Sequence, residues 1–196
     1  MNTDEIVVRI ADINDKKYAV TISEQMEASA KQRGTGISKR SPASIAQKIQ
    51  DGKAVIALTK NNEWVGFAYM EIWSKGEFVS NSGMIVNPFY RGRGIAKALK
   101  EKVFGLARQI YPLAKIFSIT TTAAMMKMNM QLGFEPVIYD ALPQENKFWQ
   151  GCRSCVNYGI LKNKKHRNCL CTAMLFTPAI KKHAEKHERK TVSSVN

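Results

Sequence analysis

Long apolar segments, acidic residues and several familiar motifs are scarce or missing in this chain of 196 residues. No apolar run approaches the roughly 20 residues that a membrane-spanning helix needs, and the acidic start, Met1 to Glu5, lacks the apolar core of a secretory signal. We therefore expect a soluble, cytoplasmic protein without a membrane partner. No Gly-Lys-Ser or Gly-Lys-Thr follows a glycine-rich turn, which excludes a Walker-type nucleotide site. The sequence contains no Cys-His arrangement that would argue for a covalent intermediate on the enzyme.

The charge balance is strongly basic, with 30 Lys and Arg against 16 Asp and Glu and a net charge of +14. Such a balance suits a polyanionic ligand, either a nucleic acid or a nucleotide cofactor. Basic residues gather late in the chain, at 162–167 and 181–190. We interpret the first cluster as a solvated loop. We expect one domain over 1–180, with a cysteine-rich segment at 152–171, and a basic, disordered tail over 181–196 that includes His183 and His187.

Apolar periodicity divides the chain into strands and helices. Short apolar runs predict strands at 7–10, 54–59, 64–73, 78–86, 115–120, 134–139 and 170–177. Helical spacing and end signals predict helices at 15–33, 42–51, 95–110 and 123–132. Asn61 and Asn62 mark a hairpin turn between two of the strands. This order predicts an α/β fold in which a mixed sheet carries helices on both faces.

The stretch from Met84 to Leu99 carries the clearest functional signal. The strand that contains Met84, Ile85 and Val86 must end before Pro88, which cannot donate to a sheet ladder. In Arg91-Gly92-Arg93-Gly94 the two glycines let successive N–H groups point into one concavity. The helix that follows, with Ile95 and Ala96 in its first turn, aims unpaired N–H groups at the same turn. The sequence therefore predicts an anion site with two added arginine charges.

This order of strand, proline, arginine-glycine turn and helix resembles the acyl-CoA pyrophosphate loop of the GNAT superfamily of N-acyltransferases, with Arg91, Gly94 and Ala96 in the three defining places. The resemblance implies a mixed, mostly antiparallel sheet with helices on both faces, and an acyl-CoA donor. It assigns the donor site to Met84, Ile85, Val86, Arg91, Gly92, Arg93, Gly94, Ile95 and Ala96. The segment Leu132 to Pro136 looks like the family's Gly-Phe segment after its fourth helix.

Within the superfamily, three segments are similar to the acetyltransferase domain of N-acetylglutamate synthase, here in a short form without the kinase-like domain. They are 36–41, then Thr121-Thr122 with 133–137, and Arg153-Ser154. The resemblance implies that acetyl-CoA or succinyl-CoA acylates the α-amine of glutamate or a similar acidic amino acid, in arginine biosynthesis. It assigns carboxylate binding to Arg40, Arg153 and Ser154, with Lys75 as a further cation. We also expect a small-molecule amine as the acceptor, a homodimer, and no nucleic acid partner.

The catalytic groups depart from the family's pattern. Many GNAT enzymes have a Glu on the strand before the loop as a base, but residues 81–84 contain no carboxylate. Many also have a Tyr before the Gly-Phe pair as the acid for the leaving thiolate, and Asn129 stands there instead. Glu71 or Glu77 could serve as the base, and Asn129 could hydrogen-bond the leaving sulfur. Proximity alone supplies much of the rate, and a backbone N–H near Met84 to Val86 could polarise the thioester carbonyl.

All four cysteines lie in two close pairs, Cys152 with Cys155 and Cys169 with Cys171. Clustered cysteines in an intracellular protein indicate a metal more often than disulfides. Two close pairs on a hairpin would supply the four soft ligands of a tetrahedral, structural zinc site, with His166 as a substitute ligand. Four reduced cysteines near the last strands remain the alternative.

Two other functions stay open at this point. The same fold could acylate a polyamine, an antibiotic or a protein amine, which an acidic acceptor pocket would favour and the basic loop at 33–40 disfavours. A basic, zinc-containing nucleic-acid-binding module would use the basic clusters and the cysteines. That module leaves Arg91 to Ala96 without a role, and no aromatic residues are interleaved with its basic runs.

Overall fold

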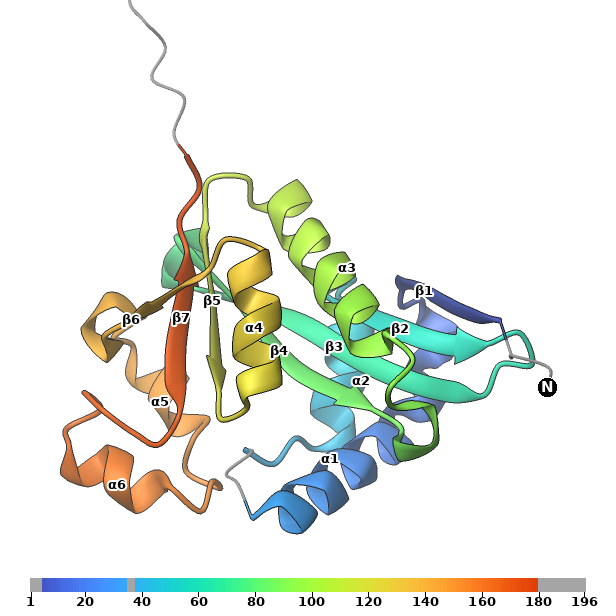
Figure 1. The fold of residues 1–196 in the computed structure, drawn as a ribbon, viewed down its shortest axis with the longest axis horizontal. Helices are drawn as coiled ribbons and strands as arrows, with labels where there is room; N and C mark the ends of the chain where they lie inside the picture. The colour runs from blue at the N-terminus through green and yellow to red at the C-terminus, as the bar shows by residue number, and fades with distance from the viewer. Residues whose placement is uncertain (1–4, 35–37, 180–196) are drawn as a thin grey trace, which may run out of the picture.

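In the computed structural model, which describes residues 5–34 and 38–179, seven strands form one sheet in the order β1-β2-β3-β4-β5-β7-β6 (Figure 1). The strands are β1 Ile6–Ile10, β2 Ala54–Thr59, β3 Trp64–Trp73, β4 Phe78–Val86, β5 Lys115–Thr120, β6 Glu135–Val137 and β7 Thr172–Phe176. The β4–β5 pair is parallel and every other neighbouring pair is antiparallel. The predicted fold class, a mixed and mostly antiparallel sheet, is confirmed.

Helices cover both faces of this sheet, as expected. The α-helices are α1 Ala19–Arg33, α2 Pro42–Gln50, α3 Ile95–Ile110, α4 Ala123–Gln131, α5 Asn146–Gln150 and α6 Tyr158–Asn163, and the 3-10 helices are η1 Ile13–Tyr18, η2 Ser74–Gly76, η3 Pro88–Tyr90 and η4 Tyr139–Ala141. Helices α3 and α4 pack on one face, in a core around Leu99, Val103 and Ile116. Helices α1 and α2 pack on the other face around Ile22 and Ile45, and α5 and α6 continue that second layer over β5 and β7.

Several predicted segments differ in extent. The helix predicted from Asp15 begins as the 3-10 helix η1, because Asp12 and Asp15 form a reciprocal capping box there. The strand predicted over 134–139 has only three residues in the sheet before η4 begins. The region between the cysteine pairs contains the helix α6 and no β-hairpin, so the hairpin prediction is wrong. The basic cluster 162–167 covers the end of α6 and the turn after it, and the predicted tail 181–196 lies outside the described residues.

The feature that positions the site is a wedge between β4 and β5. The two strands pair only over Phe78–Ser80 and Lys115–Phe117. Beyond that point β4 remains paired with β3, and Ser118 to Thr120 of β5 remain paired with β7. Strands β4 and β5 therefore diverge (Figure 1). Their facing edges therefore keep backbone N–H and C=O groups that no neighbouring strand uses in the described part of the sheet.

Candidate active site

A cleft of about 450 Å³ occupies this wedge. One wall is the divergent part of β4, from Ser80 to Ile85, and the opposite wall runs from Phe117 to Thr122. Side chains of β3 and α3 lie at its base, and α5 and the cysteine segment close one end. An extended ligand could lie along the two open strand edges, as an added strand would.

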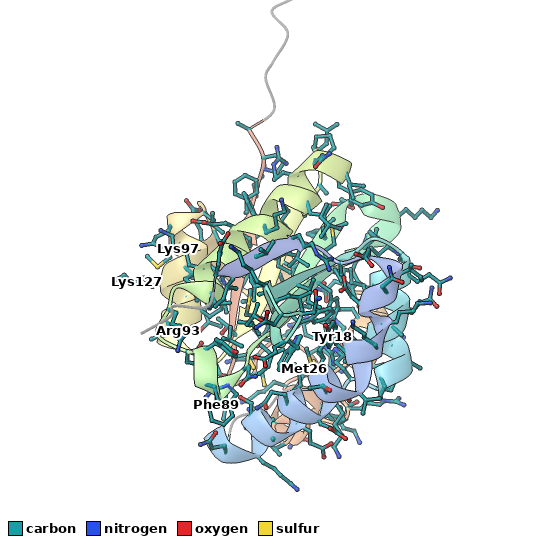
Figure 2. All side chains as sticks on the ribbon, turned by 90° about the vertical axis from the view of Figure 1, so that its right-hand side faces the viewer. Tyr18, Met26, Phe89, Arg93, Lys97 and Lys127 are labelled. Carbon is teal, nitrogen blue, oxygen red and sulfur yellow. The ribbon has the colours of Figure 1, made fainter. Side chains whose placement is uncertain are left out.

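The predicted anion loop follows β4 at the open end of this wedge. Gly92 and Gly94 have φ values of +78° and +77°, which explains glycine at both positions. Gly94 is the N-cap of α3 and has no side chain with which to cap it, so the first N–H groups of the helix stay available to a ligand. Figure 2 shows Arg93 projecting toward the same edge of the molecule as Lys97 of α3 and Lys127 of α4. The loop thus combines backbone donors with several cations.

Arg91 ties this loop to the rest of the site. Its Nε donates to the carbonyl of Val86 at 3.3 Å and its Nη2 to Ser29 Oγ of α1 at 3.4 Å. Val86 is buried against α3, whereas Met84 and Ile85 line the cleft. The residues from Arg91 to Gly94 are exposed and lie beyond the lined part of the cleft. The predicted donor residues therefore run from the cleft wall to the exposed loop, with Val86 and Ile95 buried beneath.

A β-bulge in β4 shapes the cleft wall. Phe67 pairs with Ile85 but Tyr69 pairs with Ser82, so Gly83 and Met84 together oppose a single residue of β3. Gly83 has φ +63°, and a Cβ atom there would lie 2.2 Å from Cε1 of Tyr69. Only glycine lets the Tyr69 ring pass the bulge, which places the phenol at the edge of the cleft.

Tyr69 holds Arg40. The guanidinium Nε donates to the Tyr69 hydroxyl oxygen at 2.5 Å, and Nη1 donates to the carbonyl of Ser38 at 3.1 Å. Burial raises the pKa of Tyr69 in spite of the Arg40 charge, so the phenol keeps its proton. Within residues 5–34 and 38–179, Nη2 of Arg40 has no hydrogen-bond partner. A fixed guanidinium with one unpaired nitrogen on a cleft wall suits a carboxylate.

The charged side chains that line the cleft are mostly basic. Arg40, Lys100 and Lys147 are cationic, and Glu71 is the one carboxylate among the described lining residues. Lys48 of α2 donates to Glu71 Oε1 at 2.6 Å and offsets that charge. The cleft therefore favours an anionic ligand over a cationic one.

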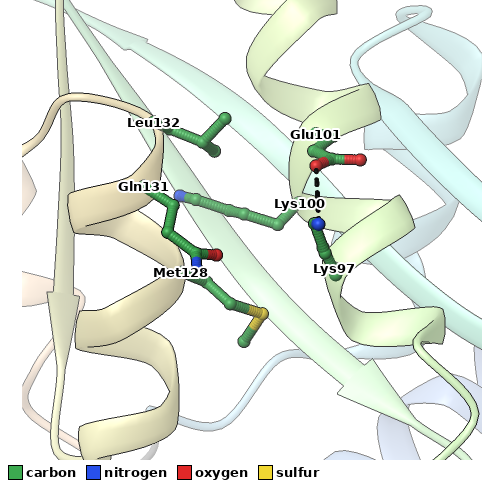
Figure 3. Close-up of a pocket in the computed structure, with 6 residues that line it drawn as sticks. All are labelled: Lys97, Lys100, Glu101, Met128, Gln131 and Leu132. Atoms are coloured by element: carbon green, nitrogen blue, oxygen red, sulfur yellow. Dashed lines mark ion pairs between the residues drawn. The ribbon is translucent and has the colours of Figure 1, made fainter.

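A second polar group is buried under the wall formed by α3 and α4. Lys100 is 2% exposed, and its Nζ donates to Asn81 Oδ1 of β4 at 3.2 Å. Figure 3 shows Lys100 reaching from α3 across to α4, beside Gln131 and Leu132. Asn129 of α4 is fully buried, and its amide donates weakly to the sulfur of Met174 at 3.4 Å. It is the one buried residue of α4, although four methionines were expected to fill the core there.

Several of the other predicted site residues do not line the cleft. Glu77 and Lys75 are exposed on the turn before β4, and Glu77 lies 3.8 Å from Lys115. Arg153 is exposed and lies outside the lining, whereas Ser154 Oγ accepts from the backbone N–H of Lys39 at 2.9 Å. The segment that contains Ser154 thus braces the Arg40 loop. The structure brings Arg40, Glu71 and Met84 into one cleft and leaves Glu77, Lys75 and Arg153 outside it.

The four cysteines converge at the closed end of the cleft. Burial, and after it the four neighbouring thiols, raise the pKa of the Tyr139 hydroxyl, which donates to the carbonyl of Cys171 at 2.8 Å. Burial also raises the pKa of Cys152, and that of Cys171 to about 12, so these thiols are poor nucleophiles. Cys152, Cys155 and Cys171 line the cleft, while Cys169 faces the carbonyl of Asn157 at 3.9 Å.

In the described part of the chain, no three Cys, His, Asp or Glu side chains are placed to hold an ion together. His166, the predicted substitute ligand, stacks on Trp149 with ring centroids 5.4 Å apart. The zinc site of Cys152, Cys155, Cys169 and Cys171 therefore stays a prediction. Metal analysis of protein purified without chelators tests it: about one zinc per chain is the predicted result, and a metal-free protein would contradict it.

Sequence reasoning missed Tyr69, Lys100 and Lys147. Tyr69 and Lys147 give no local signal, because their role depends on the bulge and on α5. Lys100 did carry one, since it follows Ala96 by four positions and precedes Val103 by three. That spacing puts a lysine on the apolar face of α3.

Comparison with known proteins identifies the class. The family model described as "Acetyltransferase (GNAT) family" matches residues 15–134. The match spans more than half of the chain, so the chain belongs to this family. Membership makes the chain an acetyltransferase of the GNAT class and confirms the resemblance seen in the Arg91–Ala96 loop.

Solved structures with the same fold come from several enzymes. A Mycobacterium tuberculosis protein in complex with CoA has 18% identity and a TM-score of 0.62, over 88% of this chain and 99% of that chain. N-acetylglutamate synthase from Neisseria gonorrhoeae, with coenzyme A and N-acetyl-glutamate, has 15% identity and a TM-score of 0.62, over 90% of this chain but 36% of that chain. A phosphinothricin acetyltransferase from Sinorhizobium meliloti, with AcCoA, has 17% identity and a TM-score of 0.57, over 89% of each chain.

At such low sequence identity, the structural similarity shows a shared fold and no more. The named enzymes differ in their acceptors, so the acceptor of this chain has to be inferred from the residues of the cleft. A comparison with curated protein sequences gave no match. Among the helices of the described residues, none combines the length and the apolar character that spanning a bilayer requires.

Proposed function

We propose that this chain transfers an acetyl or succinyl group from CoA to the α-amine of glutamate or a similar acidic amino acid, as a step of arginine biosynthesis. The observation that carries the proposal is Arg40, which Tyr69 holds on the wall of a basic cleft that continues into the anion loop. The similar structures support the donor, because CoA or AcCoA is bound in each of them. The Neisseria structure also contains N-acetyl-glutamate.

The donor would bind along the surface that α3 and β4 share. Its phosphates fit the uncapped N-terminus of α3 and the cations Arg91 and Arg93. The extended, amide-containing arm of CoA fits the wedge, where the divergent edges of β4 and β5 offer backbone donors and acceptors. This arrangement would bring the thioester to the Met84–Ile85 part of the cleft, where a backbone N–H can polarise its carbonyl.

The acceptor would bind from the opposite face, which α1, α2 and α5 cover. A side-chain carboxylate could accept a hydrogen bond from the unpaired Nη2 of Arg40, and Lys147 adds a second positive charge. Glu71 lines the same part of the cleft and could receive a proton from the α-ammonium group, directly or through water. The neutral amine then attacks the thioester carbon, and the C–S bond breaks as the tetrahedral intermediate collapses.

A cationic acceptor fits this cleft less well. A polyamine or an aminoglycoside would meet Arg40, Lys100 and Lys147, with Glu71 already paired with Lys48. An uncharged amine or a protein N-terminus would leave Arg40 without a function. A nucleic-acid-binding role would leave the whole cleft without one, and salt-sensitive gel-shift binding would be its signature.

The Arg40→Ala substitution tests the acceptor assignment. Loss of the Nη2 hydrogen bond and of the guanidinium charge is expected to raise the KM for glutamate by about 10- to 100-fold, whereas the KM for acetyl-CoA should change by less than about threefold. Steady-state kinetics with each substrate varied in turn measures both constants. Arg167→Ala, which removes an exposed arginine of the 162–167 cluster, is the matched control. An unchanged KM for glutamate in Arg40→Ala would contradict the assignment.

A further inference from the structure

Lys100 is the one charged residue of the cleft to which the proposed function gives no role. Lysine is almost never fully buried unless it is paired, yet Lys100 is 2% exposed and lies on the same face of α3 as Ala96 and Val103. No carboxylate in the described residues lies within ion-pair distance of its Nζ. A buried, uncompensated ammonium is costly for folding, and a residue that is costly for folding at a cleft wall calls for a functional explanation.

Most of the groups around Lys100 are uncharged, and its only charged neighbours in the adjoining pocket belong to its own helix, α3. Asn81 of β4 accepts from its Nζ, and the ring centroid of Phe134 lies 4.6 Å from it. Helix α4 contributes Met128, Gln131 and Leu132 to the adjoining pocket (Figure 3). The charged neighbours in that pocket are Lys97 and Glu101 of α3 itself, which pair with each other at 3.8 Å. Burial therefore acts alone on Lys100 and lowers its pKa to about 7.

Two further buried polar groups near Lys100 each have an atom without a hydrogen-bond partner among the described residues. Asn81 Nδ2 and Asn129 Oδ1 are buried and have no hydrogen-bond partner among the described residues. Buried amide groups nearly always have a partner in a folded protein. The two open positions lie on β4 and α4, the elements that Lys100 reaches between. Of these groups, Lys100 and Asn81 also line the cleft, where a bound molecule could contact them.

Lys100 lies on the donor side of the cleft. It is five residues after the first residue of α3, which is about 7.5 Å along the helix axis from the anion loop. Arg40 and Glu71, by contrast, belong to the acceptor side. A group on the donor side can act on the leaving sulfur, and an amide such as Asn129 can hydrogen-bond that sulfur but cannot donate a proton to it.

We propose that Lys100 is the general acid of acyl transfer, whose ammonium group donates a proton to the thiolate that leaves the tetrahedral intermediate. The N–C bond to the acceptor forms, and the C–S bond breaks with its electron pair on sulfur. Sulfur takes a proton from Lys100, and the proton lost by the acylated nitrogen passes through water back to the Lys100 amine. This role rests on the proposed transfer from an acyl-CoA but is independent of the acceptor's identity.

The energetics of this proton transfer are favourable. An ordinary lysine, with a pKa of about 10.4, is a weak acid toward an alkyl thiolate, whose conjugate thiol has a pKa of about 8.5. With its pKa lowered to about 7, Lys100 gives up its proton to such a thiolate readily. A pKa close to the working pH lets Lys100 carry a proton and still release it, which is the compromise that general acid catalysis needs.

Lys100→Met tests the proposal, with Lys102→Met, an exposed position of the same helix, as the control. Release of CoA thiol from acetyl-CoA is followed in single turnovers between pH 6 and 9, with whichever amine the wild-type protein acylates. CoA binding is measured separately by calorimetry. We expect Lys100→Met to bind CoA as the wild type does and to react about 100-fold or more slowly. The ratio of the wild-type rate to the Lys100→Met rate should fall with rising pH above about 7 as Lys100 loses its proton, because the titration of the acceptor amine affects both rates equally.

Three results would overturn the proposal. One is a variant rate within threefold of the wild-type rate at pH 7, and another is a ratio of the two rates that does not change between pH 6 and 9, as a purely structural role predicts. The third is loss of CoA binding in the variant, which would make Lys100 a binding residue. If Lys100→Met does not fold, Lys100→Gln serves for the same comparison of rates. A wild type that binds CoA but does not acylate glutamate counts against the acceptor alone.

Discussion

Replacement of Gly83 by alanine is expected to lower the free energy of unfolding by about 3 kcal/mol or more. A non-glycine residue at φ +63° costs about 1–2 kcal/mol. The added Cβ would also lie 2.2 Å from Cε1 and 2.6 Å from Cδ1 of Tyr69, and overpacking of this kind costs about 1–3 kcal/mol. Because Tyr69 is buried and bonded to Arg40, the ring cannot move without releasing the guanidinium.

Denaturant unfolding of Gly83→Ala and Gly105→Ala measures this effect. Gly105 lies within α3, and no described atom beyond its own helix lies within 4 Å of the position that a Cβ would take there. Alanine at that position should therefore stabilise the helix by up to about 1 kcal/mol. Any folded Gly83→Ala protein should also show a raised KM for the acidic acceptor. A Gly83→Ala protein as stable as the wild type would show that the bulge does not need glycine.

Lys100→Met is expected to stabilise the fold at neutral and acidic pH, although it slows the reaction. The folded-state pKa of about 7 lies below the unfolded value, so the unfolded chain binds more protons between about pH 7 and 10. Wild-type stability therefore rises with pH through this window, and below pH 7 the buried charge costs the wild type at most about 5 kcal/mol. The variant lacks this cost at every pH.

Thermal or urea unfolding of both proteins at pH 6, 7 and 8.5 tests this prediction. The advantage of Lys100→Met over the wild type should shrink by about 1.5 kcal/mol between pH 7 and 8.5, as the wild-type amine loses its proton. The difference between the two proteins isolates Lys100, because the buried cysteines titrate equally in both. A difference in stability that does not change with pH would mean that Lys100 titrates normally in the folded state.

The sequence predicted the central strands and the conformation of the Arg91–Gly94 turn well, because their signals are local. Strands β3 and β4 have the predicted limits, since Asn61-Asn62 and Pro88 mark the turns beside them. The Arg91–Gly94 turn needs only its own glycines and the helix that follows. Such features depend on neighbouring residues and not on the rest of the fold.

The region after α4 was predicted less well, because its structure depends on distant partners. Strand β6 has only three residues, fewer than predicted, because only those three pair with β7. Helix α6 buries a single residue, Leu161, under the cysteine segment and so has almost no amphipathic pattern. The hairpin expected for the cysteine pairs was therefore wrong, although the thiols do converge around Tyr139.

The chemical part of the site could be predicted only in outline. Arg40 was predicted from a short resemblance, but its orientation comes from Tyr69, which is 29 residues away in the chain and is positioned by the Gly83 bulge. In the sequence, Glu71 and Glu77 were equally good candidates for the base. In the structure Glu71 lies on β3 and lines the cleft, whereas Glu77 lies on the turn before β4, outside the cleft. The significance of Lys100 appears only when its burial is known.

The most direct test of the account is a product assay by mass spectrometry. Purified protein is incubated with a panel of amino acids that includes L-glutamate, with acetyl-CoA and succinyl-CoA in parallel reactions. The proposed function predicts an N-acylated acidic amino acid, whose mass identifies the acyl group and which disappears in Arg40→Ala. Acylation of basic or neutral amines alone, or no acylation by a protein that binds CoA, would contradict it.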